Sequence, residues 1–375
     1  MLKVLHIVEN FNGQATEKWL FQIFKELQKG DNETDWTFYC LLDEPGKFSD
    51  KVVEQGGRVI CSPITISSLI PFIRFFRKTI SNGSYDVIHC HQDLMSAICL
   101  LASIGMPVGK RIVHIHNTSL SLPTQSRFKS FVFRWLFKHI CIYLSDHIVG
   151  VSDDALKAFY HGSKKSKMSV IHCGIDLLPF RGNTNNTHNF RKSLDIPDDA
   201  DIMLFVGRMT EYKNPCFVLD VLEQLLLNQN NVYAVFVGVG PFENDVSIMA
   251  DKKSVTDRVR VLGWKNNVPQ IMRSCNLLIW PGVEDPMEGL GLGVIEAQAA
   301  GLKVVMSLNV PIEAIIISEM VNVVPLSSGA KVWADTITDI LRHSSLDSQE
   351  ALQRIEESSF SISESALNIK LLHNS

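Results

Sequence analysis

The sequence lacks a Cys-x-x-Cys pair, an internal repeat and any low-complexity segment. Its eight cysteines stand singly, which argues against a disulfide framework or a structural zinc site and fits a reducing compartment. The longest apolar run, residues 94–108, falls short of the roughly 20 residues that cross a bilayer. The first eight residues suggest a first strand and not a signal peptide. We therefore expect a soluble, cytoplasmic protein.

Acidic residues are scarce in one part of the chain. With 375 residues, 46% hydrophobic and 20% charged, the composition excludes a disordered or collagen-like chain, and the length suggests two domains. The net charge is −4, yet residues 55–145 hold ten basic and two acidic residues, or +8, which leaves −12 elsewhere. One face of the first half is predicted to be electropositive.

Short apolar runs alternate with helix-length amphipathic stretches, which predicts α/β architecture with parallel sheets. We expect two Rossmann-like, doubly wound domains facing across a cleft, because open α/β sheets bind ligands at their carboxyl edges. The predicted parts are a first domain (1–180), a polar linker (181–200), a second domain (201–347) and a helical tail (348–375) that packs back toward the first domain. The predicted strands are 3–8, 37–41, 58–61, 87–91, 111–116, 147–151, 169–173, 202–206, 232–237, 259–262, 277–280, 303–306 and 322–324.

A glycine-rich loop gives the strongest motif. Strand 277–280 leads into PGVEDPMEGLGLGVIEAQAAG, where glycines precede a helix that Gly301 would close. Free backbone N–H groups at such a helix start suit an anion. Glu288 and Glu296, eight residues apart, would lie about 12 Å apart if helical, too far for a paired acid and base but suited to two ends of a diphosphate-linked molecule. The alternative is an acidic loop and one solvated glutamate.

This segment resembles the Glu-x7-Glu signature of the retaining glycosyltransferases built from two Rossmann-like domains (GT-B; glycosyl transferases group 1, family 4). Four further segments agree in order: DVIHCH (86–91), VIHCGID (170–176), FVGR (205–208) with Lys213, and GVGP (238–241). The chain departs from the family pattern at Cys173, Asn214 and Leu302-Lys303, and by a longer loop before Glu288.

The resemblance implies roles for named residues. Glu288 and the amides of Leu290, Gly291 and Leu292 would hold the donor sugar and its pyrophosphate. Arg208 and Lys213 would stabilise the charge that develops on a nucleoside diphosphate leaving group; read without the family, both are solvated surface charges.

Further positions follow from the same resemblance. Glu296 would bind the ribose, the backbone near Trp264 the base, and Gly13 would lie near the donor phosphate or acceptor. His116 would position the transferred sugar, although a buried, hydrogen-bonded histidine is the alternative.

No metal is expected. His89, His91, His114 and His116 alternate on strands, which puts His114 and His116 on one face, but the spacing of a metal-binding motif is absent. Asp199 and Asp201 superficially form a D-x-D pair but precede a strand and suit a solvated turn. Arginine, lysine and a helix N-terminus would supply the electrostatic work of a metal.

Basic residues interleave with aromatic ones in Ile70–Ile80 and Arg127–Tyr143. This pattern suits contact with an anionic membrane surface, here the inner face of the cell membrane, and the alternative is that the aromatics are core and the cations a solvated rim. No nucleic-acid-binding module is recognisable.

We therefore predict a retaining, metal-independent glycosyltransferase that uses a nucleotide sugar and a sugar or lipid-linked acceptor, as in surface polysaccharide synthesis. One rival is a nucleotide-sugar epimerase or hydrolase, separated by NMR of the products. A non-catalytic partner subunit, which would bind nucleotide without turnover, is the other.

Overall fold

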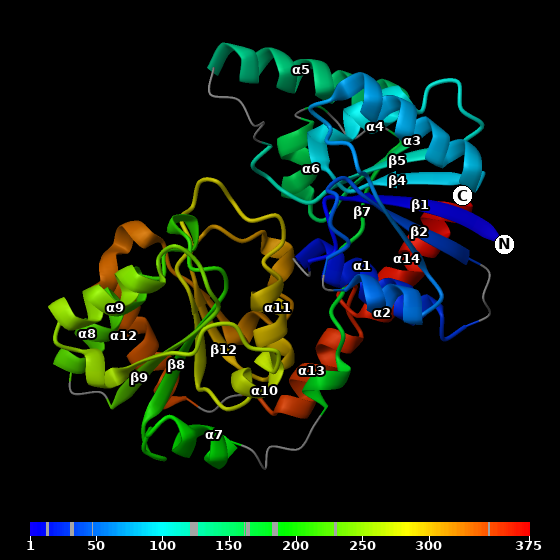
Figure 1. Ribbon diagram of the computed structural model, residues 1–375. Coiled ribbons are helices and arrows are strands. Elements are labelled where there is room, and N and C mark those ends of the chain that lie inside the picture. The colour runs from blue at the N-terminus through cyan, green and yellow to red at the C-terminus, as the bar shows by residue number, and fades with distance from the viewer. Residues whose placement is uncertain are drawn as a thin grey trace. The chain divides into compact units, whose positions relative to one another are not determined.

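The computed structural model describes residues 1–12, 15–30, 34–46, 48–120, 127–160, 162, 166–181, 187–228, 231–343 and 346–375, with backbone alone at 127–129 and 187–188 (Figure 1). The chain divides into two compact units. The N-terminal unit comprises Met1–Ile175 and Ile362–Ser375, and the C-terminal unit comprises Asp176–Ser361. The chain therefore passes from one unit to the other twice.

The N-terminal unit is built on a seven-stranded sheet in the order β3-β2-β1-β4-β5-β6-β7, and every pairing is parallel. Because the order reverses between β1 and β4, helices cover both faces. The strands are β1 (Leu2–Val8), β2 (Thr34–Cys40), β3 (Arg58–Cys61), β4 (Val87–Cys90), β5 (Lys110–Ile115), β6 (His147–Gly150) and β7 (Met168–Val170).

Two helical layers enclose this sheet. On one face Phe72 and Phe76 pack with Leu5, Ile7 and other buried side chains. The opposite face contacts Trp19 and His373, from the first and last helices, which also pack on each other. The helices are α1 (Ala15–Leu27), α2 (Ser49–Glu54), α3 (Leu69–Gly83), α4 (Ser96–Ala102), α5 (Arg127–Leu144), α6 (Asp153–Phe159) and α14 (Ile362–Asn374).

The C-terminal unit has a six-stranded parallel sheet in the order β10-β9-β8-β11-β12-β13. Its order reverses between β8 and β11, so the crevice expected at such a switch point lies at the carboxyl ends of these two strands. The strands are β8 (Asp201–Val206), β9 (Val232–Val237), β10 (Val259–Val261), β11 (Leu277–Trp280), β12 (Lys303–Met306) and β13 (Val321–Val323).

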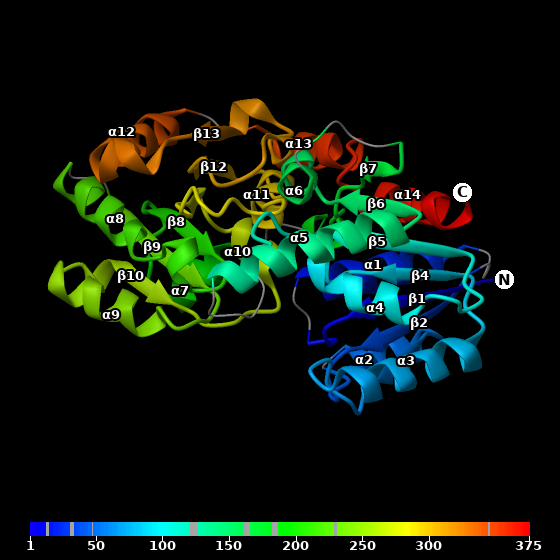
Figure 2. The ribbon, with the colours of Figure 1, turned by 90° about the horizontal axis from the view of Figure 1, so that it is seen from above.

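A large apolar core lies on one face of this second sheet, where Phe205 and Phe236 meet Leu222 and Trp333. The helix α11 (Leu292–Ala299) packs on β11, β12 and the helix α13 (Ser348–Glu356). Figure 2 gives a second view of these elements. The helices are α7 (Thr187–Ser193), α8 (Phe217–Leu227), α9 (Glu243–Lys252), α10 (Val268–Met272), α11 (Leu292–Ala299), α12 (Gly329–Arg342) and α13 (Ser348–Glu356).

The prediction of two doubly wound, Rossmann-like domains is confirmed, and the thirteen predicted strands correspond to the observed ones with small shifts at their ends. The expected linker, 181–200, is not structureless, because it contains α7. Buried Arg191 at the end of that helix donates to the Ala200 carbonyl at 2.6 Å and to Asn276 Oδ1 at 2.9 Å, within the C-terminal unit. The expected tail divides: α13 belongs to the C-terminal unit and α14 to the N-terminal unit.

Candidate active site

The carboxyl edge of the C-terminal sheet collects the predicted donor-site residues. Because all six strands run parallel, the segments after β8, β10, β11 and β12 emerge at one edge. Arg208 follows β8, Trp264 follows β10, and the glycine-rich loop follows β11. The topology thus brings together residues that are far apart in sequence.

Lys213 and Glu288 form an ion pair that connects the segment after β8 to the loop after β11. Their side chains are only 11% and 10% exposed. The Lys213 ammonium also lies 4.2 Å from the centre of the Trp280 ring and 5.0 Å from that of Tyr212. A charge pair is therefore held in a largely desolvated, aromatic setting at the switch point, where solvent screens charges only weakly.

Burial is the main cause of the pKa shifts of Lys213 and Tyr212. Burial lowers the pKa of Lys213 while the Glu288 carboxylate opposes that shift, and the charge of Arg208 lowers it further. Burial raises the pKa of the Tyr212 hydroxyl, and nearby Glu288 adds to the effect. The neighbourhood of Lys213 thus contains a second cation whose repulsion an added anion would relieve.

Backbone contacts fix the loop after β11. The Glu288 amide donates to the Asn309 carbonyl at 2.7 Å, and the Val283 amide donates to the Tyr212 carbonyl at 2.9 Å. Gly291 has φ 79°, and a Cβ there would lie 2.5 Å from a methyl group of Val310. Only glycine meets both conditions, so this position sets how the chain enters α11.

Glu296 lies within α11, whereas Glu288 lies in the loop before the helix starts at Leu292. The helical estimate of about 12 Å between the two carboxylates was therefore wrong in its premise, since only part of the interval is helical. The helix ends as expected, with Gly301 at φ 76° just beyond it. Leu290 and Gly291 are buried and Leu292 is half-buried at the start of the helix.

Two of the predicted donor-site residues are exposed to solvent. Arg208 is exposed, and its positive charge lowers the pKa values of Lys213 and Tyr212. Trp264 is 66% exposed, so its indole lies at the surface beside the edge of the sheet. Gly13 lies outside the described residues.

His116 follows β5 at the carboxyl edge of the N-terminal sheet. Its amide donates to Asp93 Oδ1 at 2.7 Å, and the Asn117 side chain donates to the other carboxylate oxygen at 2.7 Å. Burial lowers the pKa of His116 to about 3 and raises that of Asp93 to about 6. The imidazole is therefore neutral near pH 7 and can hydrogen-bond a ligand without bringing a charge.

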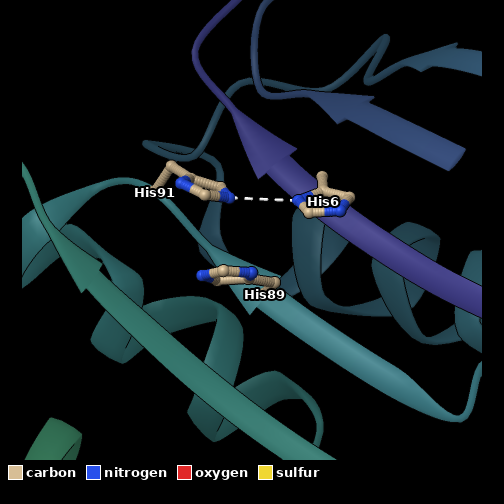
Figure 3. Close-up of side chains that lie close together, drawn as sticks. All are labelled: His6, His89 and His91. Carbon is tan, nitrogen blue, oxygen red and sulfur yellow. Dashed lines mark hydrogen bonds between the residues drawn. The ribbon is translucent and has the colours of Figure 1, made fainter. Parts of the chain in front are cut away.

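The histidines next to His116 are brought together by neighbouring strands. His91 Nδ1 lies 3.0 Å from His116 Nε2, and His91 Nε2 lies 3.1 Å from His6 Nδ1 (Figure 3). His114 and His116 share a face as predicted, with ring centres 4.4 Å apart. The argument from spacing along the chain against a metal cluster fails here, because the nitrogens converge from different strands.

The two basic, aromatic stretches behave differently. In α3, Phe72 and Phe76 are fully buried, so the interpretation of Ile70–Ile80 as a membrane-facing surface was wrong for these two aromatic side chains. In α5, Phe131, Trp135 and Tyr143 are 70%, 57% and 79% exposed. The helices in the described part of the chain include none with the length and apolar character needed to cross a membrane.

Several residues of these two edges were not predicted. Tyr212 and Trp280 surround the Lys213 ammonium, and Asn309 holds the Glu288 backbone. Asn309 follows β12, so the rule that strand ends carry function could have found it. No local signal distinguishes His6 or His373 from core residues.

Two family profiles match the chain. "Glycosyltransferase Family 4" matches residues 17–177, and "Glycosyl transferases group 1" matches residues 186–358. The described elements of the two units fall largely within these ranges.

Curated relatives agree with the profiles. EpsF of Bacillus subtilis (strain 168), assigned as a glycosyltransferase, is 26% identical over 341 residues, covering 89% of this chain and 86% of its own. The UDP-Gal:alpha-D-GlcNAc-diphosphoundecaprenol alpha-1,3-galactosyltransferase of Escherichia coli is 24% identical over 265 residues, covering 66% of this chain and 64% of its own.

A solved structure shows the same fold. Anabaena HepE, crystallised in complex with UDP and glucose, superposes with a TM-score of 0.79 at 17% identity, with all of both chains covered. Its likeness, together with the two profiles and the two parallel sheets, identifies the architecture. The chain belongs to the group 1 glycosyltransferases of the GT-B fold.

Proposed function

We propose that this glycosyltransferase transfers a sugar, with retention of anomeric configuration and without a catalytic metal, from a nucleoside diphosphate donor to a sugar or lipid-linked acceptor. The observation that carries the donor half is the Lys213–Glu288 pair at the switch point of the C-terminal sheet. HepE, which has the same fold, binds UDP and glucose, which supports a nucleotide sugar as donor.

The roles follow from charge. Breaking the bond between the sugar and the diphosphate leaves negative charge on the phosphate, and Lys213 and Arg208 are the cations that would stabilise it. Glu288 and the amides of Leu290, Gly291 and Leu292 would bind the sugar and pyrophosphate, with Glu296 on the ribose. The backbone beside Trp264 would bind the base.

Retention is proposed from the resemblance to retaining glycosyltransferases. A same-face displacement is proposed as its route because the described donor-site residues suggest no covalent nucleophile. The acceptor hydroxyl would attack the anomeric carbon on the face that the diphosphate leaves. The departing phosphate oxygen would take the hydroxyl proton, so one C–O bond forms as another breaks. His116, neutral at pH 7, would donate or accept a hydrogen bond to the sugar and act as a positioning residue.

A lipid-linked acceptor is supported by the surface of α5. Two of its exposed aromatics, Phe131 and Trp135, line a hollow of about 270 Å³ within the N-terminal unit, whose mostly apolar walls also carry Arg134 and Lys138. Cations near an anionic membrane contribute about 1 kcal/mol each. The Escherichia coli relative acts on a diphosphoundecaprenol-linked sugar, and we extend that acceptor class, and assembly of surface polysaccharide, to this chain as part of the proposal.

The donor assignment is tested by calorimetric titration with UDP and other nucleoside diphosphates. Lys213→Met should weaken binding about tenfold to a hundredfold, since a charge-assisted hydrogen bond contributes about 1.5–3 kcal/mol. The matched control is Lys331→Met, because Lys331 is exposed on α12. Equal affinity in Lys213→Met and wild type would refute the site, and inversion seen by NMR of the product would refute retention.

The membrane contact is tested by sedimentation with phosphatidylglycerol and phosphatidylcholine vesicles. Wild type should sediment with the anionic vesicles, and Trp135→Ser should sediment less. Leu227→Ser is the control, since Leu227 is 71% exposed in the other unit. Equal loss in both variants, or no sedimentation of wild type, would contradict the role of α5.

A further inference from the structure

Six of the twelve histidines gather on one face of the N-terminal sheet. They come from three adjacent strands and the last helix: His6 from β1, His89 and His91 from β4 and the residue after it, His114 and His116 from β5 and the residue after it, and His373 from α14. The proposed transfer uses His116 alone, which leaves the other five without a role. An ion bound at His116 Nε2 would leave Nδ1 of the same ring for the proposed hydrogen bond to the sugar.

We propose that His91, His114 and His116 form a three-histidine binding site for a zinc ion. One ring nitrogen of each of these residues lies within 4.8 Å of those of the other two. A tetrahedral zinc ion with bonds of about 2.0–2.1 Å holds its ligand nitrogens about 3.3 Å apart. His91 Nδ1 and His116 Nε2, at 3.0 Å, are already close to that spacing. Rotation of the His114 side chain would bring its nitrogen, which lies within 4.8 Å of the other two, to the same spacing.

The nitrogen available on His114 supports this choice. His114 Nδ1 faces His89 Nε2 at 3.3 Å, while His114 Nε2 is buried and makes no hydrogen bond to the described part of the protein. In the tautomer whose Nδ1–H donates to His89, the Nε2 of neutral His114 carries the lone pair, which is the form that binds a metal ion.

Three further histidines, His6, His89 and His373, form hydrogen bonds that would orient the proposed ligands. Zinc-ligating histidines usually bond through their other nitrogen to a fixed acceptor, which orients the ring. Here His91 Nε2 is hydrogen-bonded to His6 Nδ1 at 3.1 Å, and His114 Nδ1 is hydrogen-bonded to His89 Nε2 at 3.3 Å. His89 Nδ1 is in turn hydrogen-bonded to His373 Nε2 at 3.0 Å. The backbone of the third ligand, His116, is fixed by Asp93.

Accessibility favours this triad over the other one. His6, His89 and His91 also converge (Figure 3), but all three are buried, and both nitrogens of His89 are engaged by His114 and His373. His116 is partly exposed, so an ion can reach the site from that side. Three imidazoles favour zinc, cobalt, nickel or copper over magnesium or calcium.

The test uses the full chain after dialysis against EDTA and then metal-free buffer. Co²⁺ is added first, because tetrahedral cobalt absorbs visible light, and Zn²⁺ is then titrated to displace it. We expect one equivalent of metal to bind with micromolar or tighter affinity. Absence of stoichiometric binding by wild type would overturn the proposal.

Variants locate the ion. His114→Asn should lower zinc affinity at least tenfold, and His89→Asn, which removes a supporting contact, by about 10–100-fold. His343→Asn, at an exposed histidine of the other unit, should bind as wild type does. Unchanged affinity in His114→Asn would refute the site.

X-ray absorption of the zinc-loaded wild type covers the case in which a variant does not fold. A nitrogen and oxygen shell with outer scattering from imidazole rings is expected, whereas sulfur scattering would assign the ion to cysteine and end the proposal. These readouts are independent of transfer, so they distinguish failure of this site from failure of the proposed function.

Discussion

Neutralising either partner of the Lys213–Glu288 pair should destabilise the C-terminal unit far more than neutralising both. The two side chains are about a tenth exposed, so removing one leaves the other as a buried, unpaired charge. That situation costs about 3–5 kcal/mol, whereas replacing a buried pair with neutral groups of similar size is often close to neutral. Since whole domains are stable by about 5–15 kcal/mol, the single variants should be readily measured.

The experiment is a double-mutant cycle with Lys213→Met, Glu288→Gln and the combination, each unfolded in urea at pH 7. Each single variant should lose about 3 kcal/mol or more, and the double variant should recover at least about 2 kcal/mol of the summed loss. Lys331→Met serves again as the exposed control. If the two losses add to within about 0.5 kcal/mol, the pair is not coupled and our account of the site's electrostatics is wrong.

Three further predictions concern stability and reactivity. Ile369→Ala, at a fully buried position of α14, should lower the free energy of unfolding in urea by about 2–5 kcal/mol. The control is Leu371→Ala on the same helix, where the side chain is 57% exposed and little stability should be lost. Equal losses of stability would show that α14 does not pack as described. Gly238→Ala should lose a few kcal/mol in thermal unfolding, because its Cβ would lie 1.9 Å from the Gly207 carbonyl oxygen, and Gly30→Ala, whose nearest atom is 3.8 Å away, is the control; similar melting temperatures would contradict the close approach. Burial raises the pKa values of Cys99 and Cys141 to about 12, so at pH 8 iodoacetamide should label them only after unfolding; rapid labelling of the native protein, read by mass spectrometry, would contradict their burial.

The strands were predictable because buried parallel strands carry continuous apolar runs. β9, Val232–Val237, is buried at every position and was predicted with the same bounds. The sheet order was not derivable strand by strand. The rule that ligands bind at strand carboxyl ends directed attention to Arg208 and the glycine-rich loop, and each does follow a strand. The loop itself was misjudged near Glu288, because its conformation depends on a long-range bond to the Asn309 carbonyl.

Other features depend on contacts that a linear pattern does not contain. α7 is short and polar and is anchored by Arg191 reaching Asn276, 85 positions away. Phe72 and Phe76 have the same amphipathic spacing whether they face lipid or a sheet, and only the packing of α3 distinguishes these cases. The histidine cluster is the extreme example, since His89 and His373 meet across 284 positions.

The return of α14 to the first unit has a consequence for biosynthesis. A ribosome makes the seven strands of the N-terminal sheet early, but the helix that carries His373 and Ser365, the hydrogen-bond partner of Trp19, is translated only after the whole C-terminal unit. The N-terminal unit therefore cannot complete its fold until α14 has been translated. Until then, the face of its sheet that carries the histidines is not covered by α14. A peptide tag or a frameshift near residue 362 should therefore destabilise mainly the N-terminal unit.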